Sequence, residues 1–237
     1  MTNLGPISWL LSIKVTRDCE NRMITLSQQS YVNSILACFN FSDAKPLSIP
    51  MDPNVAFLKD QCPSTPDDIA RMCRTPYHED IGSLMYASIS TQPDISFAVS
   101  TLSQFLDNPG PAHWEAIKHV FQYLLGMKNW GLTFGGRKEG LEGYMDADGT
   151  SQEHRRAISG YAFIINGGAI SWSSRKQELI TLSTTEAKYV ASTHAAKEAI
   201  WLCNFIGEVF APLTSPTTLH CDNQSTIAIA TNGNFHA

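Results

Sequence analysis

Two aspartates stand two positions apart in a short segment that has the pattern of a β-strand. Asp146 and Asp148 lie in EGYMDADGTS, residues 142–151, where apolar and polar residues alternate in part. Ionised carboxylates close together repel each other unless a proton or a cation lies between them. Two interpretations therefore stay open, a solvated strand end and one carboxylate of a cation site.

Two more acidic residues lie at the borders of expected elements later in the chain. Glu186 opens a long helix in LSTTEA, and Asp222 ends a strand in LHCDNQ. Each has an explanation without function, because Glu186 can form a capping box with Ser183 and Asp222 can cap the following helix. If the first and fourth strands of this region are neighbours and the helix packs on them, Asp146, Glu186 and Asp222 converge at one edge of a sheet.

Three converging carboxylates would have a specific chemistry. Ligand sets made only of oxygen suit Mg²⁺ or Mn²⁺. Two such ions roughly 3.5–4 Å apart activate water and stabilise the leaving oxygen of a phosphodiester. Asp146, Glu186 and Asp222 are therefore the candidate catalytic and metal-binding residues. A carboxylate-pair glycosidase is an alternative, but the small neighbours of Glu186 do not suit a sugar cleft lined with aromatic side chains.

The elements that would position these residues follow one another as β-β-β-α-β-α. The turn Asn166-Gly167 predicts a hairpin between the second and third strands, because both residues accept positive φ. The order predicts a mixed sheet with helices against it, in which the helix crosses over to a strand that pairs parallel. The expected strands are 141–148, 158–165, 169–173 and 217–221, and the expected helices are 183–210 and 223–230.

The preceding part of the chain is mostly helical in its pattern. The stretch 42–66 has five prolines and reads as an extended linker, and the glycine-rich stretch 135–140 reads as a hinge. We therefore expect an α/β chain of the mixed α+β class with three parts, 1–65, 66–136 and 137–237. Strands are expected at 6–15 and 23–26, and helices at 27–38, 78–90, 94–106 and 113–127.

Composition restricts the possible compartments and partners. A net charge of -5 does not favour a broad basic surface for nucleic acid, although it leaves room for a local basic patch. The six cysteines show no CxxC pair, so we expect neither a zinc cluster nor a disulfide framework. The apolar start of the chain is too short to span a bilayer. We expect no membrane partner and a cytoplasmic or nuclear protein.

Residues 141–237 resemble the ribonuclease H domain of copia-type retrotransposon polyproteins. The resemblance rests on GYMDADGTS, RRAISGYAFIINGGAISWSSRKQELITLSTTEAKYVA, AAKEAIWLCNFI and CDNQSTIAIA. It implies a ribonuclease H-like fold and assigns Asp146, Glu186 and Asp222 as ligands of Mg²⁺ or Mn²⁺, two ions in the intact family site. The implied reaction is hydrolysis of the RNA strand of an RNA–DNA hybrid, which leaves a 3′-hydroxyl and a 5′-phosphate.

The first two parts resemble the end of the reverse transcriptase of the same polyproteins. GPISWLLSIKV and ITLSQQSYVNSIL are similar to the last palm strands and the start of the thumb, and residues 77–126 to the helical thumb and connection. The polymerase sequence Tyr-x-Asp-Asp is absent. Asp67 and Asp68 form the one Asp-Asp pair and start a helix, so we expect no polymerase activity.

The family places a fourth carboxylate beyond the segment at which this sequence ends, Asn232 to Ala237. We therefore expect a weakened site, and the alternative function is a catalytically inert relic that folds and binds nucleic acid. Four basic residues next to the expected strands are candidates for contacts with the phosphates of the hybrid, with solvated loop charges as the alternative. These residues are Arg155, Arg156, Arg175 and Lys176.

Overall fold

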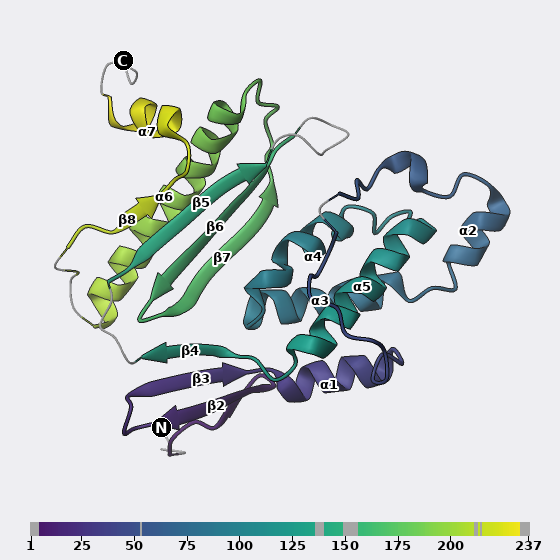
Figure 1. The fold of residues 1–237 in the computed structure, drawn as a ribbon, viewed down its shortest axis with the longest axis horizontal. Coiled ribbons are helices and arrows are strands. Elements are labelled where there is room, and N and C mark those ends of the chain that lie inside the picture. Colours follow the sequence, from purple (N-terminus) through teal and green to yellow (C-terminus); the bar gives the residue numbers. More distant parts are fainter. Residues whose placement is uncertain are drawn as a thin grey trace. The chain divides into compact units, whose positions relative to one another are not determined.

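The protein consists of two compact units, Met1–Gly135 and Gly136–Ala237 (Figure 1). The computed structural model describes residues 5–52, 54–135, 140–148, 156–210, 213 and 215–232. In its described part, each unit combines a four-stranded sheet with helices. The first sheet is antiparallel and the second is mixed, which confirms the expected α+β class.

The sheet of the first unit differs from the prediction at both of its edges. The expected single strand 6–15 reverses at Leu11 and Ser12, whose φ angles are 48° and 62°. Neither residue favours positive φ, so no local turn signal marks this reversal. The last strand was not predicted, because four residues carry little periodicity. The strands in sheet order are β1 Trp9–Leu10, β2 Ile13–Asp18, β3 Met23–Ser27 and β4 Leu132–Gly135.

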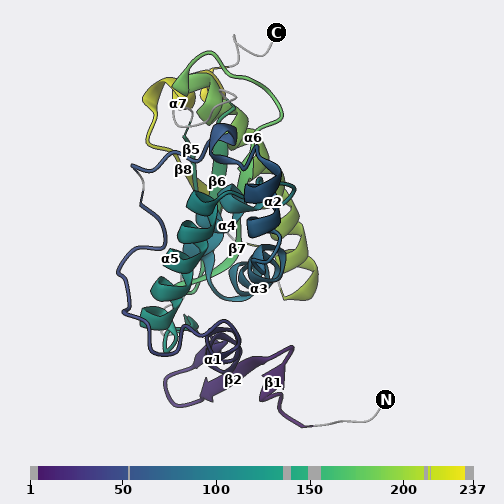
Figure 2. The same ribbon diagram turned by 90° about the vertical axis from the view of Figure 1, so that its right-hand side faces the viewer.

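The helices of the first unit lie close to their predicted positions. They share one hydrophobic core, to which α1, α3, α4 and α5 all contribute fully buried side chains such as Leu36, Leu84, Leu102 and Phe121. Residues of the expected parts 1–65 and 66–136 thus pack into the same core. Figure 2 shows α1 next to β2, and these elements are in contact. The elements are α1 Gln29–Cys38, η1 Lys59–Gln61, α2 Pro66–Met72, α3 Tyr77–Ser90, η2 Pro93–Ile95, α4 Ser96–Ser103 and α5 Pro111–Met127.

A buried histidine caps the start of α5. The Gly110 N–H donates to Nδ1 of His113 over 2.8 Å, and the imidazole stacks on Phe105 with ring centroids 3.8 Å apart. Burial lowers the pKa of His113 to about 4, so the ring is neutral at pH 7. Because Nδ1 accepts a hydrogen bond, the proton of the neutral ring lies on Nε2.

Replacing Gly110 with alanine is expected to lower the free energy of unfolding by roughly 2–3 kcal/mol, the range of a steric insertion into a packed site. A Cβ at this position would lie 2.0 Å from the carbonyl oxygen of Gln61. Gly82→Ala in α3 is the matched control, since no atom lies within 4 Å of its added Cβ. Alanine in a helix interior should stabilise that site by about 0.5–1 kcal/mol. Thermal unfolding of the full chain tests the difference, and equal shifts of the two midpoints would contradict it.

The second unit has the predicted order of elements. Its sheet has the order β7-β6-β5-β8, in which β5 and β8 are parallel and the other pairs antiparallel. The hairpin between β6 and β7 turns at Asn166 and Gly167, with φ angles of 50° and 79°, as expected. The elements are β5 Glu142–Asp148, β6 Ile158–Ile165, β7 Gly168–Lys176, α6 Thr184–Val209, β8 Thr218–His220 and α7 Gln224–Thr231.

Helix α6 covers one face of this sheet (Figure 1). Along β5 the burial alternates, so that Met145 and Ala147 face the core while Asp146 is exposed. The helix approaches the sheet through a line of alanines, Ala187, Ala191 and Ala195, each at most 1% exposed. Small side chains at this contact let the helix axis lie close to β5. Among the described residues, no helix has the length and apolar character needed to cross a bilayer.

Candidate functional site

The parallel pairing of β5 with β8 brings two of the predicted aspartates to the same level of the sheet. Tyr144 lies opposite His220 in the register of this pair. Asp146 and Asp222 each follow two residues later. Parallel strands run in the same direction, so equal steps from a shared register pair end side by side. The expected neighbourhood of the first and fourth strands is therefore confirmed.

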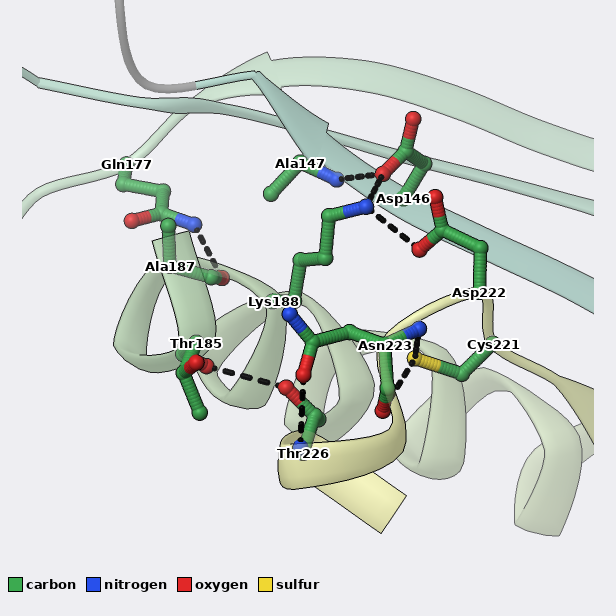
Figure 3. A network of polar contacts seen from close by, with 10 residues as sticks. All are labelled: Asp146, Ala147, Gln177, Thr185, Ala187, Lys188, Cys221, Asp222, Asn223 and Thr226. Atoms are coloured by element: carbon green, nitrogen blue, oxygen red, sulfur yellow. Dashed lines mark hydrogen bonds and ion pairs between the residues drawn. The ribbon is translucent and has the colours of Figure 1, made fainter. Parts of the chain in front are cut away.

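A lysine from α6 lies between these two carboxylates (Figure 3). The Lys188 Nζ is 2.9 Å from Oδ1 of Asp146 and also forms a hydrogen-bonded ion pair with Oδ1 of Asp222. The side chain of Lys188 is only 14% exposed, whereas those of both aspartates are 68% exposed. The ammonium is thus held on the protein side of the pair, and the carboxylates remain open to solvent.

The ion pair between Lys188 and Asp222 shifts the pKa values of both groups in the direction that keeps them charged. The hydrogen bond with Asp222 is the main reason that the pKa of Lys188 is raised above its ordinary value. The same bond lowers the pKa of Asp222. Two carboxylates near one ammonium leave one net negative charge at neutral pH, so the cluster still attracts cations.

The loop after β8 frees Asp222 from a capping role. The cap of α7 is Asn223, whose Oδ1 accepts from the Thr226 N–H over 2.8 Å. Thr226 Oγ1 in turn donates to the carbonyl oxygen of Thr185 over 3.1 Å, which ties α7 to the start of α6. Asp222 therefore does not have the capping role that the sequence left open, and its carboxylate faces Lys188 instead.

Glu186 has the structural role that the sequence left open for it. Its N–H donates to Oγ of Ser183 over 3.1 Å, and its Oε2 accepts from the Leu182 N–H over 2.7 Å. This arrangement satisfies backbone donors at the start of α6 in the manner of a capping box. Among the residues that the structure describes, no group of three or more His, Cys, Asp or Glu side chains is placed to hold a metal ion.

The structure thus brings Asp146 and Asp222 together with Lys188, and it does not bring Glu186 to them. Lys188 is not among the residues predicted for the site. One signal for it was available, because Lys188 directly follows the first alanine of the line Ala187, Ala191 and Ala195 that faces the sheet. A lysine that borders such a contact can extend its apolar stem along the interface and place its ammonium at the rim.

Those predicted basic residues that the structure describes lie at the end of the sheet where β5 finishes, which is also the end that carries Asp146. Arg155 lies outside the described residues, and Arg156 is exposed. The register sets Arg175 and Lys176 opposite the beginning of β6. Arg175 pairs with Glu178 over 3.2 Å, and both side chains are exposed. A cavity of about 470 Å³ opens here between the sheet and α6, and its lining includes Arg175, Lys176, Glu178, His194 and Lys197.

Comparison with known proteins finds relatives among transposon polyproteins. The chain is 42% identical to the Retrovirus-related Pol polyprotein from transposon TNT 1-94 of Nicotiana tabacum, over all of this chain and 18% of that protein. It is 34% identical to the Retrovirus-related Pol polyprotein from transposon RE1 of Arabidopsis thaliana, over 90% of this chain and 14% of that protein. The chain therefore spans less than a fifth of the length of these polyproteins.

A third relative is much shorter. The Secreted RxLR effector protein 161 of Plasmopara viticola is 45% identical over 135 residues, which are 55% of this chain and 94% of that protein. No family model matches the chain. No solved structure matches it either.

Proposed function

We propose that the second unit of this chain is a ribonuclease H-type nuclease. The chain is of retrotransposon polyprotein origin and is similar over 90% or more of its length to Retrovirus-related Pol polyproteins of plant transposons. In this proposal the unit hydrolyses the RNA strand of an RNA–DNA hybrid. The observation that carries the proposal is the convergence of Asp146 and Asp222 on one cation.

The donor set of this pair fits a divalent ion such as Mg²⁺ or Mn²⁺. Oδ1 of Asp146 and Oδ1 of Asp222 bind the same ammonium nitrogen, so two hard oxygen donors face one point. Mg²⁺ in proteins commonly has one or two carboxylate ligands and takes the rest from water and phosphate. When bound, such an ion activates water and stabilises the leaving oxygen of a phosphodiester. Glu186 can serve as a third ligand only after it releases the Leu182 N–H.

The residues of the chain itself supply the charge distribution that a hybrid requires. Asp146 and Asp222 hold the cation at the open edge of β5, beyond the last residue that β8 pairs. In the proposal Arg156, Arg175 and Lys176 bind phosphates of the hybrid from the same end of the sheet, which would position the scissile strand. Arg175 would exchange its exposed partner Glu178 for a phosphate, and exposed ion pairs of this kind contribute little to stability.

The test is cleavage of a labelled RNA–DNA hybrid by the full chain in Mg²⁺ or Mn²⁺. We expect metal-dependent cleavage by the wild type that leaves 3′-hydroxyl and 5′-phosphate ends. Mutation of residues that hydrogen-bond to a metal ligand typically lowers activity by about 10–100-fold. Asp146→Asn changes a ligand itself and should lower the cleavage rate by more than that. Asp148→Asn is the matched control, because it makes the same charge change two positions along β5 and should alter the rate by no more than a few-fold. Equal losses in both variants, or cleavage in the presence of a chelator, would contradict the proposal.

A second function, binding of the hybrid without cleavage, is supported by one observation. The ammonium of Lys188 already lies between the two aspartates, where the metal ion needed for cleavage would bind. The same hybrid in a gel-shift experiment separates the two functions: a retarded hybrid that stays intact in both metals indicates binding alone. Since phosphate contacts dominate such binding, its affinity should fall steeply with salt.

A further inference from the structure

We propose that Lys188 acts as a tethered cation that competes with divalent ions for the pair Asp146 and Asp222, and that position 188 controls the metal affinity of the site. The inference rests on the proposed function for the identity of the competing ion. It assigns a role to a residue outside the predicted ligand set. It also predicts that a single substitution of Lys188 lets a divalent metal ion take the place of the ammonium.

The position of the ammonium is the first argument. Lys188 Nζ lies at the point toward which Oδ1 of Asp146 and Oδ1 of Asp222 are both directed (Figure 3). An ion that used both oxygens would have to occupy the same space. The ammonium must therefore leave before the ion enters, or it must stay close beside the ion, where like charges repel each other.

The anchoring of the helix backbone is the second argument. The carbonyl oxygen of Ala187 accepts from Nε2 of the buried Gln177 over 2.8 Å, and the carbonyl oxygen of Thr185 accepts from Thr226. Residue 188 therefore follows a segment that is bonded on one side to Gln177, the residue directly after β7, and on the other side to α7. The helix cannot turn to present Glu186 in place of residue 188 without breaking these bonds. Entry of an ion therefore requires the side chain of Lys188, and not the helix backbone, to move.

Because the backbone before position 188 is fixed, a different side chain at this position would also start toward the two aspartates. Lys188→Met keeps the length of the apolar stem and removes the positive charge, so it should relieve the competition. Lys188→Glu should do more, because it adds a third carboxylate that points to the aspartates. A glutamate side chain is shorter than lysine by about one bond, and a metal ion fills the space between the carboxylates. Affinity for hard cations rises with the number of charged oxygen ligands.

Mn²⁺ binding by the full chain tests the inference without reference to activity. Titration followed by the electron paramagnetic resonance of free Mn²⁺ gives the dissociation constant of each variant. We expect Lys188→Met to bind roughly 10-fold more tightly than the wild type and Lys188→Glu roughly 100-fold more tightly, as expected for a changed ligand charge. Lys197→Met removes a lysine from the exposed face of the same helix and should leave the constant within about 2-fold, since distant exposed charges are screened.

One further variant, a double substitution, makes the outcome decisive. Asp146→Asn combined with Lys188→Glu should remove the gain, and a gain that persists would place the ion elsewhere and overturn the inference. Equal dissociation constants for the wild type, Lys188→Met and Lys188→Glu would overturn it as well. If circular dichroism shows that Lys188→Glu does not fold, the comparison of Lys188→Met with Lys197→Met decides alone.

The experiment separates this inference from the proposed function. Tight Mn²⁺ binding by Lys188→Glu without any cleavage of the hybrid would overturn the proposed function and leave the role of Lys188 intact. Cleavage by the wild type together with unchanged Mn²⁺ affinity in the Lys188 variants would overturn the role of Lys188 and leave the nuclease function intact.

Discussion

Asp80→Asn is expected to raise the free energy of unfolding of the first unit by up to about 4 kcal/mol near pH 8 and to change it little near pH 4. The carboxyl group lies on the core face of α3 with 0% exposure, and neither of its oxygens has a hydrogen-bond partner among the described residues. Burial raises the pKa of Asp80 from its ordinary value of 3.8 to about 7, with a smaller effect from Glu79. The difference corresponds to about 4 kcal/mol at 1.36 kcal/mol per pKa unit.

The sign of the pH dependence follows from proton binding. Between about pH 4 and pH 7 the folded chain keeps the Asp80 proton while the unfolded chain loses it, so stability falls as the pH rises through this range. The amide of asparagine has no such proton, and the variant should lack this dependence. Below about pH 4 both states are protonated, and the neutral acid and the amide should behave alike.

Hydrogen exchange of the α3 amides in the full chain, corrected for the intrinsic rate at each pH, measures this effect in the first unit alone. Glu79→Gln is the matched control, because it removes the neighbouring carboxylate at an exposed position and should change stability by at most about 0.5 kcal/mol. A wild type whose α3 protection does not fall between pH 4 and pH 7 would contradict a carboxyl group that is protonated in the core.

Phe163→Ala is expected to destabilise the second unit by about 3–5 kcal/mol, the usual cost of removing a buried aromatic ring. Phe163 in β6 is 0% exposed and lies opposite Gly143 in β5. A Cβ on Gly143 would lie 2.5 Å from Cε1 of Phe163 and 2.9 Å from Cδ1 of Leu219. The ring thus fills the space that the glycine leaves open. A loss of this size is a large share of the about 5–15 kcal/mol that stabilises a typical domain.

Denaturant unfolding of the full chain measures the loss, and Phe210→Ala is the control. Phe210 follows the last residue of α6 and is 80% exposed, so the same truncation there should cost no more than about 0.5 kcal/mol. Gly143→Ala alone should destabilise by about 1–3 kcal/mol through overpacking. Combined with Phe163→Ala it should cost less than the sum, because the added methyl enters the emptied space. Strictly additive losses would show that the ring and the glycine do not share this space.

Elements with strong local signals were predictable from the sequence. The hairpin at Asn166 and Gly167 follows from the ease with which both residues adopt positive φ, and the long helix α6 follows from its periodicity and its Ser183 cap. The order of elements also predicted a crossover helix to a strand that pairs parallel, whereas the choice of β5 as the neighbour of that strand entered the prediction only as a condition. What these features share is that short-range chemistry or connectivity determines them.

The features that were missed depend on distant contacts. The reversal at Leu11 and Ser12 uses residues that do not favour it, and Tyr86 of α3 donates a hydrogen bond to the carbonyl oxygen of Leu11. Lys188 reaches the aspartates only because the line of alanines sets the distance and the rotation of α6 against β5. Positions 186 and 188 lie about 200° apart around the helix, so the rotation of α6 decides which of them faces the sheet edge. No local pattern in the sequence determines that rotation.

The pairing of β3 with β4 has a consequence for the synthesis of the chain. Met23 pairs with Gly135 and Leu26 with Leu132, so the sheet of the first unit joins segments more than a hundred positions apart. On a ribosome β3 emerges long before its partner, and its unpaired backbone groups stay available to other nascent chains during that interval. Because contacts of such long range form slowly, closure of this sheet should be a late event in folding. Until residues 132–135 have been synthesised and have left the ribosome, the sheet of the first unit therefore has one edge, β3, without its partner strand.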